Sequence, residues 1–152
     1  MADHQGTTGL SEPIEQGDWA GWSKWLGNEP YEDHVGPFYA RRDANGRMIC
    51  GCHIGPTNVR SGNIAHGGSL MSFADYSLFL IAYDAMNGAD GVTITLNSEF
   101  LAAAPGGARL IAHGEVLRAG RGLMFVRGRI ETETDKLAVL AFSGVIKVIR
   151  PR

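Results

Sequence analysis

The fold is decided by the stretch Asn63-Ile64-Ala65-His66-Gly67-Gly68-Ser69-Leu70-Met71-Ser72-Phe73-Ala74-Asp75, in which a His-Gly-Gly sequence opens a long apolar segment. The apolar run continues to Met86 and stops at Asn87-Gly88, a pair that is typical of a helix C-terminus. Nearly every face of the segment is apolar, so we expect a helix that is surrounded by protein. Its first turn carries almost no side chains, so a ligand can approach the backbone N–H groups that every helix leaves free at its start. This N-terminus therefore predicts a site for an oxyanion.

A membrane span is the alternative for the apolar segment, because its length is close to the ~20 residues that a span needs. Asp75 and Asp84 would be costly in a bilayer, and charged flanks are missing. We therefore expect a buried helix and no membrane insertion. The first residues, 1–6, have neither the basic nor the apolar region of a signal peptide, so we expect a cytoplasmic protein.

The spacing of His66 and Asp75 along the helix limits how their side chains can meet. Asp75 follows His66 by nine residues, which on a helix is about 180° around the axis and roughly 13 Å along it. One chain cannot easily bring the two side chains together. If both belong to one active site, the simplest arrangement is a two-fold dimer in which the helix N-terminus of one subunit faces Asp75 of the other.

Composition limits the classes of protein. A chain of 152 residues with 44% hydrophobic content suits one domain, which we expect over residues 18–152 after a flexible polar tail at 1–17. The net charge is only −2 and Lys and Arg form no run, so nucleic acid is not an expected partner. Cys50 and Cys52 lie two residues apart on an expected strand, which is too close for an ordinary disulfide. We expect buried free thiols and no metal site.

The remaining elements are read from spacing and turn residues. Trp19, Trp22 and Leu26 recur at helical spacing and predict a short N-terminal helix. We expect its tryptophans to pack on a sheet edge or on a neighbouring subunit and not to bind a ligand. Asn45-Gly46 predicts the turn of a hairpin. The predicted strands cover residues 35–40, 48–54, 91–103, 108–119, 123–132 and 138–149. The short separators around residues 105–107, 120–122 and 134–136 predict that consecutive strands among the last four are antiparallel neighbours. The fold class is therefore α+β, with about six antiparallel strands wrapped around one long central helix.

This architecture, with His66-Gly67-Gly68 followed by Asp75, resembles the hotdog-fold acyl-CoA thioesterases, most closely their PaaI-like branch. The resemblance spans residues 35–149 and extends to Gly91-Val92-Thr93. It implies helices enclosed by curved sheets, a homodimer with a continuous sheet, and often a homotetramer built from two dimers. It also implies active sites that two subunits share, in agreement with the helix geometry.

The resemblance also implies roles for single residues. Gly67 would offer its backbone N–H to the thioester carbonyl, with Gly68 beside it in substrate binding. Asp75 of the partner subunit would act as general base on water or as nucleophile. His66 would either contact the thioester oxygen or cap the helix, and Thr93 matches a position where related enzymes carry a water-orienting Ser or Thr.

One position departs from the family pattern. Arg60 stands where the family usually has Asn or Gln to place the water or the carbonyl. Asn63 or Asn58 could serve instead, and Asn63 is preferred because it is closer to the helix start. Arg121 and Arg118 are candidates for binding the phosphates of coenzyme A. Phe79, with Tyr76 and Tyr83, is a candidate for lining an acyl pocket. Packing in the core would explain these three aromatic residues equally well.

Three functions follow from the sequence. The first is an acyl-CoA thioesterase that hydrolyses a small aryl- or medium-chain acyl-CoA and needs no cofactor, since coenzyme A is part of the substrate. The second is a non-catalytic acyl-CoA or acyl-carrier binding protein of the same fold, favoured if Arg60 has disabled water placement. The third is a hotdog dehydratase or hydratase, which the absence of the motifs of those enzymes disfavours.

Overall fold

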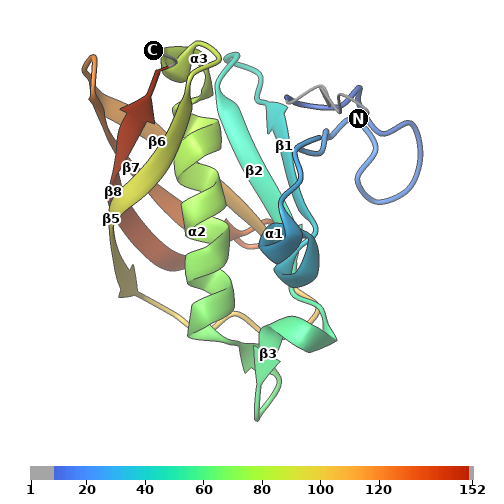
Figure 1. The fold of residues 1–152 in the computed structure, drawn as a ribbon. Helices are drawn as coiled ribbons and strands as arrows, with labels where there is room; N and C mark the ends of the chain where they lie inside the picture. The colour runs from blue at the N-terminus through green and yellow to red at the C-terminus, as the bar shows by residue number, and fades with distance from the viewer. Residues whose placement is uncertain (1–8, 151–152) are drawn as a thin grey trace.

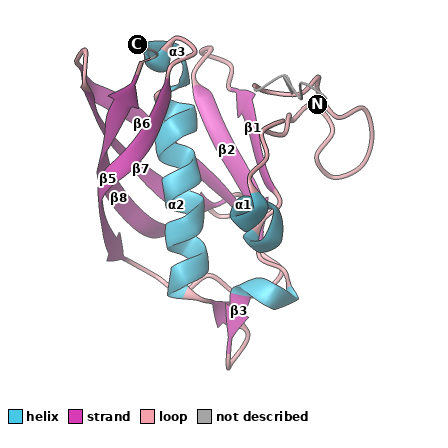
Figure 2. Ribbon diagram, viewed as in Figure 1, coloured by secondary structure: helices cyan, strands magenta, loops and turns pink. Residues whose placement is uncertain are grey.

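A curved six-stranded sheet surrounds one central helix (Figures 1 and 2). The computed structural model describes residues 9–150. The sheet has the order β1-β2-β6-β7-β8-β5, and every neighbouring pair is antiparallel. Its strands are β1 (Phe38–Arg42), β2 (Met48–His53), β5 (Asp90–Phe100), β6 (Arg109–Ala119), β7 (Leu123–Thr132) and β8 (Ala138–Ile149). The smaller elements are α1 (Pro30–Val35), a 3-10 turn η1 (Pro56–Asn58), the short pair β3 (Val59–Arg60) and β4 (Ile64–Ala65), and α3 (Tyr83–Met86). The predicted α+β hotdog fold is confirmed.

The central helix α2 spans Gly67–Ile81 and fills the inside of the sheet. Phe73 and Leu78 of this helix are at most 1% exposed and belong to the same core as Leu110, Ile130 and Leu140 of the sheet. The helix is interrupted at Ala82, and α3 continues to Met86. Asn87 then adopts a left-handed conformation with φ 48°, which ends the segment as the Asn-Gly pair predicts.

Two further expectations concern the core and the membrane. Cys50 and Cys52 are buried free thiols on the inner side of the sheet, as predicted. Among residues 9–150, none of the helices combines the length and the hydrophobicity that a membrane span requires.

The predicted order of the last four strands is wrong at one step. β6, β7 and β8 form the expected meander, but β5 pairs with β8 and not with β6. The Pro105-Gly106-Gly107 segment is therefore no hairpin turn: it passes beneath the start of α2, where Ala104 and Asn63 accept backbone hydrogen bonds from Ala65 and Gly106. This crossing carries the chain from the edge of the sheet to its middle, so that the sheet can close around the helix.

The predicted N-terminal helix is also wrong. Residues 18–21 form turns, and Gly17 and Gly21 have positive φ angles of 89° and 84°, which do not fit a helix. Trp19 and Trp22 pack on the outer face of the sheet against Tyr39 of the edge strand β1, in line with the expected packing of the tryptophans on a sheet edge. The helix of this region is instead α1, whose signals are Pro30 at its first position and acidic residues in its first turn.

The predicted N-terminal tail divides into two parts. Residues 1–8 lie outside the described residues, so the predicted flexibility of that part stays a prediction. Residues 9–17 run beside residues 22–26, with backbone hydrogen bonds from Ser11 to Lys24 and from Ile14 to Trp22.

The two edges of the sheet differ. At the β1 edge, Ser23 exchanges two backbone hydrogen bonds with Ala40, of 2.8 and 2.9 Å, so the N-terminal segment covers that strand. At the other edge, no strand among residues 9–150 pairs with the outer side of β5. Val92, Ile94 and Phe100 of β5 are 46%, 50% and 54% exposed. An uncovered edge strand with exposed apolar side chains is a surface suited to pairing with another chain.

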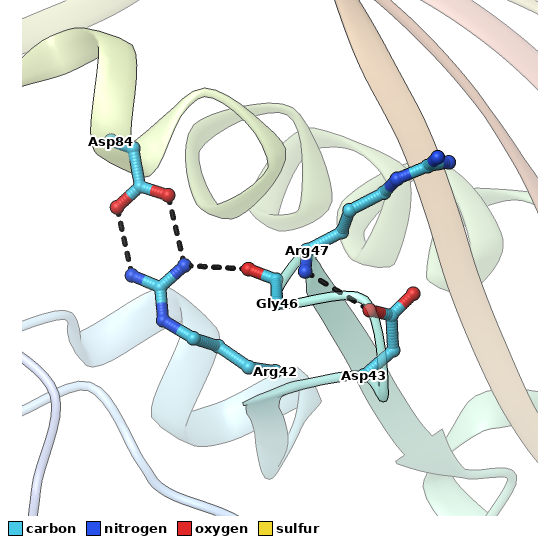
Figure 3. Close-up of polar contacts among 5 residues, drawn as sticks. All are labelled: Arg42, Asp43, Gly46, Arg47 and Asp84. Atoms are coloured by element: carbon cyan, nitrogen blue, oxygen red, sulfur yellow. Dashed lines mark hydrogen bonds and ion pairs between the residues drawn. The ribbon is translucent and has the colours of Figure 1, made fainter.

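An ion pair joins the β1–β2 hairpin to α3 (Figure 3). Both terminal nitrogens of Arg42 donate to the carboxylate of Asp84 at 2.8 Å, and Nη1 also donates to the Gly46 carbonyl at 2.9 Å. The hydrogen bonding between Arg42 and the Asp84 carboxylate lowers the pKa of Asp84. Asp43 accepts from the backbone N–H of Arg47 in the hairpin turn, so the turn is held from both ends.

Candidate active site

The start of α2 is organised by His66. Its Nδ1 accepts a hydrogen bond of 2.9 Å from the Gly68 backbone N–H, and its carbonyl accepts from Ser69 and Leu70. His66 is thus the N-cap of the helix, one of the two roles considered for it. Gly68 spends its N–H on this cap, whereas the Gly67 N–H has no acceptor among residues 9–150. Among residues 9–150, the Gly67 N–H is therefore the one backbone donor of this turn without an acceptor.

The contact between Asp75 and Thr93 joins α2 to β5. The Thr93 hydroxyl donates to Asp75 Oδ1 at 2.6 Å, and both residues are half-buried. This bond fixes the orientation of the carboxylate and leaves its second oxygen, Oδ2, for another partner. The two predicted site residues are therefore brought together, with Thr93 acting on the acid directly.

Gly67 and Asp75 are not brought together within one chain. They lie eight residues apart on one continuous helix, which is about 12 Å along its axis. The structure of the single chain thus contains a free backbone donor at one place and an oriented carboxylate at another.

The two candidate asparagines differ in their contacts. The side chain of Asn58 is buried and engaged at both ends, donating to the Val35 carbonyl at 2.6 Å and accepting from the Gly55 N–H at 3.1 Å. The backbone carbonyl of Asn58 also accepts a hydrogen bond from the His66 N–H at 2.7 Å. Asn58 therefore positions the loop before the helix. Asn63 is exposed and left-handed, with φ 55°, and its side chain lies over Gly106.

Arg60, the residue at the departing position, is exposed on β3 and donates to the Ser61 carbonyl.

Arg118 and Arg121 lie at the far end of the molecule from Gly67. The turn that they flank is at the end of the sheet where β5 begins, as the register Ala119–Met124, Met124–Ile146 and Ile146–Thr93 shows. Phe100, at the other end of β5, has its ring close to Gly67. Figure 1 shows the same separation, with α3 at one end of α2 and β3 at the other. Both arginines are exposed, and one chain does not bring them to the helix start.

A cavity of about 670 Å³ lies beside Asp75 and Thr93. Phe79, a candidate for the acyl pocket, lines it. The other aromatic residues in its wall are Trp25, Tyr76 and Tyr83. A concave space with several aromatic side chains next to an oriented carboxylate is a typical place for a small substrate.

Glu32 is a site residue that the sequence analysis missed. It lies on α1, is half-buried and lines the cavity together with Asp75. Burial, together with the negative charges of Glu29, Asp75 and Asp33, raises its pKa to about 7. The acids after Pro30 signal a helix start, but only the folded chain shows that this helix covers the cavity.

A curved antiparallel sheet around one helix, with a bare helix N-terminus and an oriented acid, defines a hotdog-fold thioester hydrolase. The sequence model of the thioesterase superfamily matches residues 62–139, just over half of the chain. The chain belongs to the thioesterase superfamily, so the predicted resemblance is confirmed.

Individual relatives agree with this assignment. PA0474 of Pseudomonas aeruginosa, whose name assigns it an unproven esterase activity, is 29% identical over 126 residues, covering 82% of this chain and 92% of the relative. PaaI of Escherichia coli, from the phenylacetic acid degradation operon, has a TM-score of 0.70 at 18% identity, with 81% and 86% of the two chains covered. A hypothetical thioesterase from Streptococcus pneumoniae, solved with coenzyme A, has a TM-score of 0.66 at 21% identity, with 76% and 88% covered. At these identities the two structural comparisons show the fold.

Proposed function

We propose that this protein is an acyl-CoA thioesterase that hydrolyses a small aryl- or medium-chain acyl-CoA to a free acid and coenzyme A. The observation that carries the proposal is the Asp75 carboxylate, oriented by Thr93 in the wall of the 670 Å³ cavity. Coenzyme A bound to the Streptococcus pneumoniae thioesterase supports the substrate class. The reaction needs no cofactor, because water, a carboxylate and a backbone donor supply its chemistry.

The active site is shared between two subunits. The exposed apolar side chains of the uncovered β5 edge support a homodimer in which two copies of β5 pair antiparallel. A two-fold axis at this edge brings the end of one subunit that carries Asp75 towards the end of the other that carries Gly67. The same pairing brings the end with Arg118 and Arg121 towards the partner's helix start, where they would meet the phosphates of coenzyme A. Two such dimers would form a homotetramer.

The reaction follows from the two groups. Asp75 of the partner subunit takes a proton from water as the water oxygen attacks the thioester carbon. The carbonyl oxygen gathers negative charge and accepts a hydrogen bond from the Gly67 N–H, which the helix dipole strengthens. The C–S bond then breaks, and the thiolate of coenzyme A receives the proton from Asp75. Direct attack by Asp75, with an acyl-enzyme anhydride that water hydrolyses, is the alternative.

Three other residues support this chemistry. Thr93 holds the carboxylate through its Oδ1 and leaves Oδ2 for the water. His66 fixes the first turn of the helix, so that the Gly67 donor stays in place. Asn63 is the candidate for placing the water or carbonyl, because the side chain of Asn58 is engaged with backbone groups.

The proposal is tested by measuring thiol release from a panel of acyl-CoAs. We expect hydrolysis by the wild type and its loss in Asp75→Ala, because the base or nucleophile is removed. Asp84→Asn is the matched control, since this acid is exposed on α3 and outside the cavity. Thiol release that survives Asp75→Ala would contradict the role of the acid. Tight binding of acyl-CoA by the wild type without any thiol release would identify a binding protein instead.

A further inference from the structure

The charge of the cavity wall is one-sided. Its lining includes the four acids Glu29, Glu32, Asp75 and Asp90, and among the described residues that line it there is no Lys, Arg or His. Its remaining wall is mostly aromatic and aliphatic, with Trp25, Phe79, Leu80, Tyr83 and Met86. Negative charge on a ligand would meet only like charge in this wall.

This one-sided charge decides which end of an acyl-CoA enters. The phosphates of coenzyme A carry several negative charges and would be repelled by the acids. The thioester carbon must lie near Asp75 if this residue is the base. The space beyond Asp75, towards α1 and α3, therefore belongs to the acyl group.

We propose that Glu32 is a specificity-determining residue: its side chain in the cavity wall excludes acyl groups that carry a negative charge at their far end. The cavity then selects an uncharged aliphatic or aromatic acyl group. This inference rests on the proposed thioesterase function, because it takes Asp75 as the mark of the thioester position.

The contacts of Glu32 support this role. No ion pair involves its carboxylate among residues 9–150, so no cation neutralises a charge at this position. Glu32 lines the cavity next to Tyr76, whose buried hydroxyl has no hydrogen-bond partner in the described part of the chain. Burial raises the pKa of Tyr76, with smaller contributions from Cys50 and Glu32. An anionic group next to Glu32 would thus be desolvated beside a like charge, with no cation among the described lining residues to offset the repulsion.

Exclusion by Glu32 has a pH dependence with a definite sign. The titratable and charged groups around Glu32 are Glu29, Asp33, Asp75, Tyr76, Cys50 and, across a smaller pocket, Lys24. Because burial and the acidic neighbours raise the pKa of Glu32 to about 7, its charge appears as the pH rises through 7. Discrimination against anionic acyl groups should therefore be weaker at pH 6 than at pH 8.

The test compares hexanoyl-CoA with adipoyl-CoA, whose acyl chains have equal length and differ by a terminal carboxylate. We expect kcat/KM at pH 8 to favour hexanoyl-CoA, and Glu32→Gln to reduce this preference about tenfold by raising the value for adipoyl-CoA. Glu32→Asp, which keeps the charge, should retain the preference. Glu12→Gln, an exposed glutamate outside the cavity, should leave it unchanged.

Two results would overturn the inference. One is equal hydrolysis of the two substrates by the wild type, and the other is a preference that Glu32→Gln does not alter. Failure of the thioesterase function is distinguished by titrating the non-hydrolysable thioether analogues of both substrates in a calorimeter. If neither thioester is hydrolysed but Glu32→Gln still reduces the difference in Kd between the two analogues, selection by charge is supported and the thioesterase function is rejected. If Kd shows no difference either, charge selection is overturned.

Discussion

In the proposed mechanism, Gly67 acts through its backbone N–H and not through a side chain. His66 has φ −69° and ψ 136°, an extended conformation that also suits the residue before a proline. Gly67 is the first residue of α2, the one helical position that tolerates proline well. A proline at this position would remove the N–H donor and leave the helix intact.

We therefore predict that Gly67→Pro lowers kcat by about 10²- to 10³-fold, the loss found when one oxyanion donor is removed. The measurement is steady-state thiol release, with circular dichroism to show that the helix persists.

Gly67→Ala is the control for this prediction, because it keeps the N–H. Its added Cβ would lie 3.3 Å from the ring of Phe100, a contact that a small ring movement relieves. Equal losses in the two variants would show that bulk at residue 67, and not the donor, limits the reaction.

The residue scale also shows how far the sequence predicts the site. His66, Gly67 and Asp75 stand out because a bare helix start is followed, early in an apolar segment, by an acid. Thr93 was found through the family resemblance, and its bond to Asp75 agrees with a role beside the acid. Glu32 could not be found in this way, because its importance comes from the position of α1 over a cavity formed by distant segments.

Among the elements, α1 lowers the free energy of unfolding by an amount that depends on pH, because it carries Glu32. The pKa of Glu32 rises from its ordinary value of 4.5 to about 7 in the folded protein. Between these values the unfolded chain releases the proton before the folded chain does, so the free energy of unfolding falls as the pH rises. The loss is complete above pH 7 and absent below pH 4.5.

We predict that Glu32→Gln stabilises the protein at pH 8 by about 1 kcal/mol and has little effect at pH 5. One pKa unit corresponds to ~1.4 kcal/mol, and the partial exposure of the side chain reduces the full value. Urea denaturation at both pH values and at fixed protein concentration measures the difference. A gain of equal size at pH 5 would mean that packing, and not charge, is responsible.

The elements also show what sequence patterns determine. All four C-terminal strands were predicted to within a few residues, because alternation and turn residues are local signals. The position of β5 beside β8 was not predicted, since strand order depends on where residues 101–108 cross the molecule. The spacing of the tryptophans misled for a similar reason: Trp19 and Trp22 contact the sheet, and Gly17 and Gly21 adopt conformations unsuited to a helix.

The whole molecule offers a test of whether two subunits share a site. In a mixed dimer, one subunit carries Asp75→Ala and the other carries Gly67→Pro. If each site takes Gly67 from one subunit and Asp75 from the other, one of the two sites keeps both groups and the other loses both.

We predict that the mixed dimer recovers about half of the wild-type activity, although both parent homodimers are nearly inactive. Co-expression with two different affinity tags isolates the mixed species, and sedimentation measures its size. Activity no higher than that of the parents would place each complete site within one chain.

The hydrogen bonds between Ser23 and Ala40 have a consequence for higher-order association. Because the N-terminal segment covers the six-stranded sheet at β1, only the β5 edge of this sheet is left unpaired among residues 9–150. Pairing of two such edges, as in the proposed dimer, would stop after two copies and would not propagate into a fibre. Deleting this segment would turn a self-terminating contact into one that can polymerise.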